Sequence, residues 1–269
     1  MTYEQVQSLK PEAFKRFCGV GSTTFAEMVS VLEQQKRKKR KPGRPPKLSL
    51  EDQVLLALQY WREYRTYFHI AQSWNINEST AFRIVRHVED TLIRSGRFSL
   101  PGKKALLQPD SVLEVVVVDV TESPVERPKK KQRQVFSGKK KYHTLKSQLV
   151  VNQKTGAIIC IAHGKGRRHD FRLFKSSKVR LANTIKLLGD KGYQGIAKLH
   201  ANSQIPTKKP KSYNLSQVQR QENRTLASER IIIEHVNRRL KIFRILSERY
   251  RNRRRRFGLR FNLIAGIYN

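Results

Sequence analysis

The chain has 269 residues, 38% of them hydrophobic, so it can bury a core and is long enough for one medium domain and a smaller one. Its 56 Lys and Arg residues far outnumber its 21 Asp and Glu residues, which gives a formal net charge of +35. These values exclude global disorder and predict a folded protein that binds a polyanion.

Nucleic acid is the polyanion that the composition favours, because basic residues that neutralise phosphates release condensed counterions. The alternative, an anionic membrane surface, calls for a long amphipathic basic helix with Trp or Phe on its apolar face, and none stands out. The two cysteines, Cys18 and Cys160, lack the spacing of a zinc finger or a disulfide framework. With no signal peptide and no apolar run of about 18 residues, we expect a soluble intracellular protein.

The N-terminal part of the chain predicts helices followed by a basic linker. Residues 1–35 form a helical segment whose apolar periodicity is broken near Gly19 and Gly21. Residues 36–48 include KRKKRKPGRPPK, which is too charged and too rich in proline to form a core, so we expect an extended tether. In a second interpretation, Arg44 of GRPPK enters a narrow DNA minor groove.

Residues 49–100 predict a helix-turn-helix domain. SLED at residues 49–52 is typical of a helix start, and the break NIN precedes a second helix that Asn77 can cap. One face of that helix is apolar: Ala81, Ile84, Val85, Val88 and Leu92. The opposite face carries hydrogen-bond donors suited to phosphates and base edges: Ser79, Thr80, Arg83, Arg86 and His87. The short turn and the overall charge favour this interpretation over an ordinary amphipathic helix in a bundle.

Residues 101–269 change to a pattern of strands with helices. VLEVVVVDV at residues 112–120 is β-branched and nearly continuous, as in a central strand covered on both faces. Residues 141–152 and 156–164 predict an antiparallel hairpin, and residues 183–190 a fourth strand. A helix is expected at residues 169–177 and a long one at about residues 228–248.

Three acidic residues stand out because the chain has so few. Asp119 ends the first expected strand, Asp190 ends the fourth, and Glu234 lies in the long helix. Strand ends in a sheet covered by helices face a common rim, where ligand sites form. Converging carboxylates repel one another, so we expect them to hold divalent cations, and oxygen ligands suit Mg²⁺ or Mn²⁺.

The helix around Glu234 has a chemical face and a core face. At about 100 degrees of rotation per residue around the helix axis, and with Arg230 at zero, Glu234 lies at about 40 degrees, Asn237 at about −20 and Lys241 at about 20. The apolar residues point the other way: Ile232, Ile233, Val236, Leu240 and Phe243. For this helix alone, a solvated stripe of i,i+4 pairs is the simpler interpretation. When the two strand-end aspartates are considered as well, a chemical face is the favoured interpretation over a solvated stripe.

Two further polar clusters allow two interpretations each. Asp170 either caps a helix or, with His169, supports or replaces a metal ligand, and the spacing does not choose between these roles. Lys139, Lys140 and Lys141 either track DNA phosphates without reading bases or form a solvated turn.

Five segments carry a family resemblance: VVVDVTESPVERP, FSGKKKYHTLKSQ, GKGRRHDFRLF, LLGDKGYQG and ASERIIIEHVNRRLKIFRIL. Together, and in this order, they resemble the DDE transposases of bacterial insertion sequences, in the branch related to eukaryotic Harbinger transposases. The family's first aspartate, its D-x-G-Y aspartate and its late glutamate match Asp119, Asp190 and Glu234. Arg230 and Lys241 fit the family's R-x3-E-x6-K spacing.

The resemblance implies an α/β fold, in which an RNase H-like mixed sheet flanked by helices follows a small all-α helix-turn-helix domain. It implies a DNA transposase that binds terminal inverted repeats and catalyses metal-dependent cleavage and strand transfer with two Mg²⁺ (or Mn²⁺) ions. Asp119 then bridges both ions, and Asp190 and Glu234 each complete one side. Arg230 and Lys241 hold DNA phosphates or pair with Glu234.

Two other functions would use the same features. A metal-dependent DNA endonuclease would direct the acids at water alone, and a non-catalytic DNA-binding regulator would use only the helix-turn-helix. The complete set of acids with its Arg/Lys spacing favours the transposase. Since a transposase joins two DNA ends, we expect a homodimer or larger assembly on double-stranded DNA, in the bacterial cytoplasm at the nucleoid, without a membrane partner.

Overall fold

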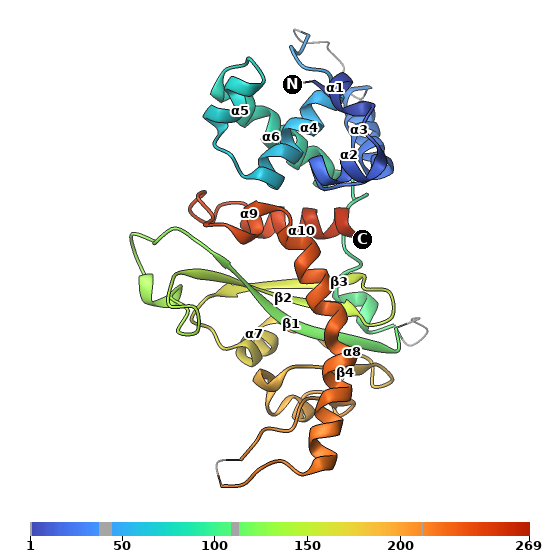
Figure 1. The fold of residues 1–269 in the computed structure, drawn as a ribbon, viewed down its shortest axis with the longest axis vertical. Helices are drawn as coiled ribbons and strands as arrows, with labels where there is room; N and C mark the ends of the chain where they lie inside the picture. Colours follow the sequence, from blue (N-terminus) through green and yellow to red (C-terminus); the bar gives the residue numbers. More distant parts are fainter. Residues whose placement is uncertain (1, 38–44, 109–112, 211) are drawn as a thin grey trace. The chain divides into compact units, whose positions relative to one another are not determined.

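The structure is a computed structural model that describes residues 2–37, 45–108, 113–210 and 212–269 (Figure 1). Arg44 lies outside these residues, so its insertion into a minor groove stays a prediction. Within the described stretches, no helix combines the length and the hydropathy needed to cross a membrane.

The described chain forms two compact units, each assembled from separate stretches of sequence. The helical unit contains the residues up to Ser99, together with Leu240–Glu248 and Arg256–Tyr268. The sheet unit contains Leu100–Arg239, Arg249–Arg255 and Asn269.

Within the ranges that the structure describes, the helical unit contains six N-terminal helices and two C-terminal ones. These are α1 (Tyr3–Gln7), α2 (Pro11–Cys18), α3 (Ser22–Arg37), α4 (Leu50–Glu63), α5 (Tyr67–Ser73), α6 (Glu78–Arg94), α9 (Arg244–Ser247) and α10 (Phe257–Tyr268). The expected cap of α4 is confirmed, because the Asp52 amide donates to Ser49 Oγ at 3.1 Å. Asn77 occupies the N-cap position of α6, but its side chain makes no capping hydrogen bond.

Helix α6 presents the apolar face that its sequence predicts. Ala81, Val85, Val88 and Leu92 are all fully buried. The turn between α5 and α6 is short, and both helices pack on α4. This arrangement leaves the other face of α6 exposed to solvent.

A buried ion cluster ties the C-terminal segment to α6. Glu89 is 0% exposed, and its two carboxylate oxygens accept hydrogen bonds from Arg260 Nε at 2.6 Å and Arg256 Nε at 2.7 Å. Trp61 Nε1 also donates to Glu89, at 3.1 Å. At Gly266 of α10, an added Cβ would lie 1.9 Å from the Phe98 carbonyl oxygen, so only glycine permits this close approach.

The sheet unit holds one mixed five-stranded sheet in the order β3-β2-β1-β4-β5. Its strands are β1 (Val115–Pro124), β2 (Thr144–Asn152), β3 (Ile158–Lys165), β4 (Lys186–Leu188) and β5 (Ser203–Gln204). The first three strands pair antiparallel, whereas β4 and β5 run parallel to β1. The short helices η1 (Lys103–Leu106), η2 (Gln132–Gln134), η3 (Lys191–Tyr193) and η4 (Ile196–Lys198) lie in the connections.

Two longer helices accompany the sheet. Helix α7 (Asp170–Ser177) packs on β2 and β3, and Phe174 joins a core cluster with Val116, Val118 and Leu187. Helix α8 (Gln217–Lys241) is the long helix of this unit (Figure 1). The Gln153 side chain, which follows β2, donates a hydrogen bond to the Glu229 carbonyl of α8. The sheet with its flanking helices has the expected α/β, RNase H-like architecture.

Three expected boundaries were wrong. Strand β1 does not end at Asp119 but continues to Pro124, because β2 pairs with it along this whole stretch. Helix α8 begins well before residue 228 and stops at Lys241, after which Phe243 starts the separate helix α9. The polar, basic sequence that precedes residue 228 concealed the first turns of α8, since its periodicity is weak.

Candidate active site

Asp119 and Asp190 lie side by side because of the parallel pairing between β1 and β4. Val117 pairs with Leu188, the last residue of β4, and each aspartate follows its paired residue by two positions. Since side chains alternate along an extended chain, each aspartate points to the same side as the paired residue before it. Two strands from distant parts of the sequence therefore bring two of the three predicted acids together.

Asp190 is held by the turn that begins η3. It is the N-cap residue of η3, and its carboxylate accepts a hydrogen bond from the Gly192 amide at 2.8 Å. A Cβ at Gly192 would lie only 3.0 Å from Asp190 Oδ1. The glycine of the D-x-G-Y sequence thus leaves room for the carboxylate, and Tyr193 anchors the turn in the core at 0% exposure.

Helix α8 brings two polar residues to Asp119. Asn237 Nδ2 donates a hydrogen bond to Asp119 Oδ2 at 3.4 Å. The Arg230 side chain, two helical turns earlier, interacts electrostatically with Asp119. Arg230 Nε and Asn237 Oδ1 are both buried without a hydrogen-bond partner in the described structure. Such polar atoms are costly to leave unpaired, so this helix face is suited to a ligand.

Burial raises the pKa of Asp119 to about 6, with further upward contributions from the Asp190 and Asp170 carboxylates. The Val120 amide and the Arg230 guanidinium act in the opposite direction but do not compensate. The same acids, together with burial, raise the pKa of the Tyr193 hydroxyl well above its usual value. The site thus concentrates negative charge, a property that a divalent cation would relieve.

Glu234 lies on the same face of α8 as Arg230 and Asn237, as the helical spacing predicts, but its side chain is exposed. Across the described residues, no group of three His, Cys, Asp or Glu side chains is placed to hold a metal ion. The structure therefore brings Asp119 and Asp190 together and leaves Glu234 outside the pair. Their carboxylate chemistry fits Mg²⁺ or Mn²⁺.

Asp170 is not the helix cap that its position suggested. His169 is the N-cap residue of α7 and makes no side-chain capping bond, while Asp170 is the first helical residue. The Asp170 carboxylate instead accepts a hydrogen bond from Lys146 Nζ at 2.7 Å. Lys146 also lies 3.7 Å from Glu122, its cross-strand neighbour. The partner of this carboxylate is therefore a lysine of β2.

Sequence reasoning missed one residue of this site and gave no role to another. Lys146 is 8% exposed near the start of β2, and only the sheet register reveals its partners. Asn237 shares the chemical face of α8, so its spacing from Arg230 carried a signal, but an asparagine is not by itself a sign of a site. The other predicted residues here, Lys139, Lys140 and His169, are exposed. Lys241 ends α8 and groups with the helical unit.

The candidate DNA-reading face of α6 is accessible. Ser79, Arg83 and His87 are exposed, and Thr80 and Arg86 are half-buried. Phe82, which the sequence analysis did not single out, is 44% exposed on the same helix, and the Arg86 guanidinium lies 5.6 Å from its ring centre. This face therefore offers donors, positive charge and an aromatic ring together.

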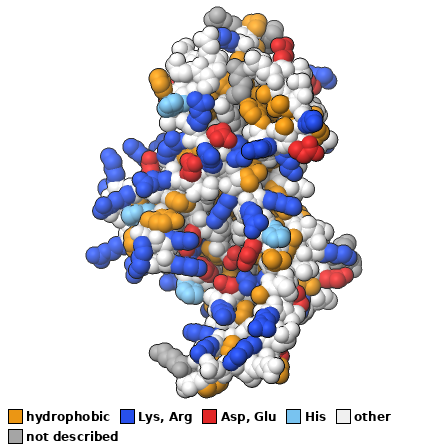
Figure 2. Space-filling model, in the orientation of Figure 1, with side chains coloured by type: hydrophobic (Ala, Val, Ile, Leu, Met, Phe, Trp, Pro, Cys, Tyr) orange, Lys and Arg blue, Asp and Glu red, His pale blue; other side chains and the backbone are white. Residues whose placement is uncertain are grey.

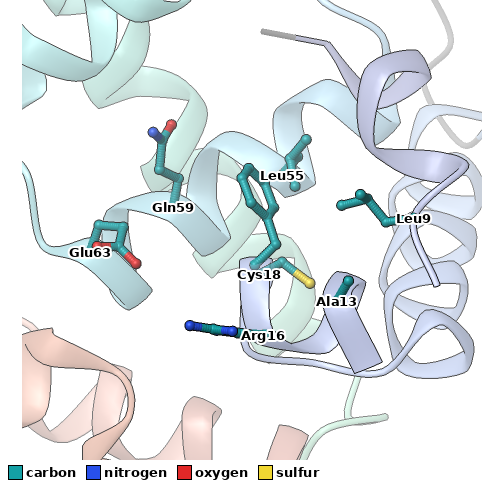
Figure 3. Close-up of a pocket in the computed structure, with 8 residues that line it drawn as sticks. Leu9, Ala13, Arg16, Cys18, Leu55, Gln59 and Glu63 are labelled. Atoms are coloured by element: carbon teal, nitrogen blue, oxygen red, sulfur yellow. The ribbon is translucent and has the colours of Figure 1, made fainter. Parts of the chain in front are cut away.

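The helical unit has a hollow of its own, and none of the predicted acids lines it. It has a volume of about 360 Å³ and is lined by side chains from α2 and α4 with Leu9 between α1 and α2 (Figure 3). Cys18 in its wall donates its thiol hydrogen to the Phe14 carbonyl at 3.2 Å, and burial raises the pKa of that thiol. The cysteine is therefore a packed core residue, and we assign the chemistry to the sheet unit.

This combination of a mixed sheet with paired strand acids and a separate helix-turn-helix defines a class of DNA-processing enzyme. Residues 118–269 match the family model of the DDE superfamily endonucleases, and residues 46–98 match the helix-turn-helix of DDE superfamily endonuclease. The chain belongs to the DDE superfamily of endonucleases, and within it to the transposases of bacterial insertion sequences. The resemblance seen in the motifs is thereby confirmed.

Two curated relatives are similar over most of their length. The chain is 58% identical over 269 residues, which is 100% of this chain and 98% of the relative, to "Probable transposase for insertion sequence element IS702" from Microchaete diplosiphon. It is 25% identical over 248 residues, covering 90% of this chain and 89% of the relative, to a protein named for a transposase of insertion sequence element IS112 from Streptomyces albus G. No solved structure matches the chain.

Proposed function

We propose that the protein binds the terminal inverted repeats of its insertion sequence, cuts DNA there and joins the freed end to a target. The observation that carries this proposal is the position of Asp119 on β1 beside Asp190, which follows the adjacent parallel strand β4, where the Arg230 guanidinium acts against several carboxylates. A cluster of this kind has no structural advantage in an empty protein, because burial and mutual repulsion both oppose its ionisation.

Asp119, Asp190 and Glu234 would hold two divalent cations, Mg²⁺ or Mn²⁺. When bound, such ions activate a water or hydroxyl nucleophile and stabilise the leaving oxygen of an in-line displacement. Asp119 would contact both cations because it lies between Asp190, which follows β4, and the chemical face of α8. Glu234, one turn from Arg230 and from Asn237, would turn toward the pair when cations and DNA are present.

The remaining residues of the site bind and orient the DNA. Arg230, which has a buried Nε without a partner, would donate hydrogen bonds to a phosphate beside the acids. Asn237 would keep Asp119 in place through its amide hydrogen bond. Lys146 would hold Asp170 at the edge of the site, so that its carboxylate does not compete for the cations. Ser79, Thr80, Arg83 and Arg86 would contact the repeat sequence in the major groove.

Strand transfer tests this function against simple hydrolysis. A duplex with a pre-cut repeat end is incubated with Mg²⁺ and a target plasmid, and joined product is measured. We expect joining by the wild-type protein and a loss of roughly a thousandfold or more in Glu234→Gln, because a cation ligand is removed. Glu222→Gln, an exposed acid on the same helix, is the matched control and keeps full activity. Cleavage without any joining would identify a hydrolytic endonuclease instead.

A further inference from the structure

A basic hollow of about 490 Å³ lies in the sheet unit, away from the paired aspartates. It is formed by two segments, the one that follows β1 and the one that precedes α10, and Val125 and Tyr250 are its buried lining residues. Five cationic side chains line it: Arg127, Lys129, Lys130, Arg253 and Arg254. Glu126 is the one acidic residue of this lining.

The two segments are fastened to each other through Tyr250, which is 0% exposed. Val125 and Tyr250 form a parallel bridge, in which the Tyr250 amide donates to the Pro124 carbonyl at 2.9 Å and the Glu126 amide to the Tyr250 carbonyl at 3.2 Å. The Tyr250 hydroxyl donates to the Arg255 carbonyl at 2.6 Å, which closes the loop that carries the arginines. The cations are thus presented by a preformed backbone.

The charges in this hollow are not neutralised by the protein. Within the described ranges, none of the five cations lies in an ion pair with a carboxylate, and Arg127 bonds instead to the neutral Gln132 side chain at 2.9 Å. Arg253 and Arg254 also have left-handed backbones, with φ of 45° and 69°. This conformation is unfavourable for arginine and is retained where the surrounding structure or a function requires it.

We propose that this hollow binds backbone phosphates of the DNA on which the protein acts, at a distance from the cut. The proposal rests on the function proposed above. Arginine forks and lysines are the donors that bind phosphate oxygens, and here both kinds converge on one concave surface. In Figure 2, Lys and Arg side chains gather at the left of the molecule, over the end of β1 and the loop after it.

Strand β1 connects the hollow to the aspartates and sets their separation. Asp119 and Val125 are six residues apart along an extended chain that rises about 3.3 Å per residue, so the hollow lies roughly 20 Å from Asp119. A DNA strand advances about 3.4 Å per base pair, so the phosphates held there are about six base pairs from the phosphate that reacts. The site would therefore fix the direction in which the duplex leaves the active site.

The salt dependence of DNA binding tests the charge contacts. Binding of a repeat-end duplex is measured by fluorescence anisotropy at several salt concentrations, with the full chain and with Arg253→Ala/Arg254→Ala. We expect the slope of log K against log salt to fall by about 2, because two phosphate contacts are lost. Arg253→Lys/Arg254→Lys keeps both charges and should keep the slope of the full chain, and circular dichroism of the alanine variant checks that it is folded. The control Lys154→Ala/Arg180→Ala removes two exposed charges elsewhere in the unit and leaves the slope unchanged.

Neutral methylphosphonate linkages, placed one at a time along the duplex, test the location. We expect the affinity of the wild-type protein to fall when the linkage lies about five to seven base pairs from the cut, and the affinity of the double alanine variant not to change there. Equal losses in both proteins, or none, would overturn the proposal. A second result would also overturn the proposal: inorganic tripolyphosphate binds only when these arginines are present, while the salt slope of DNA binding is the same in both proteins. The hollow would then bind a free anion and not DNA.

These measurements report binding and are independent of catalysis. If Glu234→Gln retained strand transfer, the proposed catalytic function would fail while the salt slope could still support the phosphate site. If the slope did not change, the phosphate site would fail while the catalytic proposal stood.

Discussion

Each unit contains a carboxylate that is shielded from solvent, fully for Glu89 and partly for Asp119, and the surroundings of the two acids are opposite. In the helical unit, Glu89 is fully buried and accepts hydrogen bonds from Arg256, Arg260 and Trp61. In the sheet unit, Asp119 accepts a long hydrogen bond from Asn237 and is stabilised by the Val120 amide, but burial, together with its carboxylate neighbours, still raises its pKa.

The difference separates an acid that serves stability from one that serves chemistry. A buried ion pair is stable when its geometry is good and its remaining polar atoms are satisfied, as around Glu89. Asp119 instead adds repulsion to the empty protein, which is useful only if a cation binds there. In so basic a chain, the partners of an acid therefore indicate whether it serves stability or chemistry.

The strongest test of this difference replaces Asp119 and Glu89 by their amides. Asp119→Asn should reduce Mg²⁺-dependent cleavage by roughly a thousandfold or more, because the amide is a poor cation ligand, while repeat binding changes little. Glu89→Gln should weaken cleavage and binding together, because it destabilises the helical unit. Both activities are measured on the same labelled duplex. Unchanged cleavage by Asp119→Asn would contradict the catalytic role.

Removing one cation from the Glu89 cluster should cost stability. Arg260→Ala leaves a buried carboxylate short of a partner, and we expect it to lower the free energy of unfolding by about 3 to 5 kcal/mol. Arg244→Ala, which removes an exposed arginine 3.5 Å from Glu63, is the control and should cost less than about 1 kcal/mol. Urea unfolding followed by circular dichroism measures both. Similar losses in the two variants would show that burial does not distinguish these pairs.

The smallest effect concerns pH. The pKa of Asp119 is about 6 when folded, above its ordinary value of 3.8, so the folded protein takes up this proton before the unfolded chain does. Stability of the wild type relative to Asp119→Asn should therefore rise by about 1 to 3 kcal/mol as the pH falls from 7 toward 4. At pH 7, Mg²⁺ should raise the melting temperature of the wild type alone. Parallel pH curves for the two proteins would contradict this account.

Local patterns were enough for part of the site. Asp119 and Asp190 could be paired from sequence because a β-branched run and a second strand each lead into an acid, and the face of α8 followed from helical spacing. The ion pair between Lys146 and Asp170 could not be predicted, since it depends on the register of β2 against β1 and on where α7 starts. The addition of α10 to the helical unit also lacked a local signal, because its partner Glu89 lies far away in the chain.

Because Arg260 of α10 completes the ion cluster around Glu89, the helical unit can finish folding only after the C-terminal segment has been synthesised. Glu89 and Arg260 are 171 positions apart, so at about 5 to 20 residues per second a ribosome needs roughly 10 to 30 seconds to add the arginine after the glutamate. Until then the nascent N-terminal helices contain an acid without its counterions. A product of interrupted translation would carry the same defect and would be less stable than the full chain, because a buried carboxylate without its paired cations is destabilising.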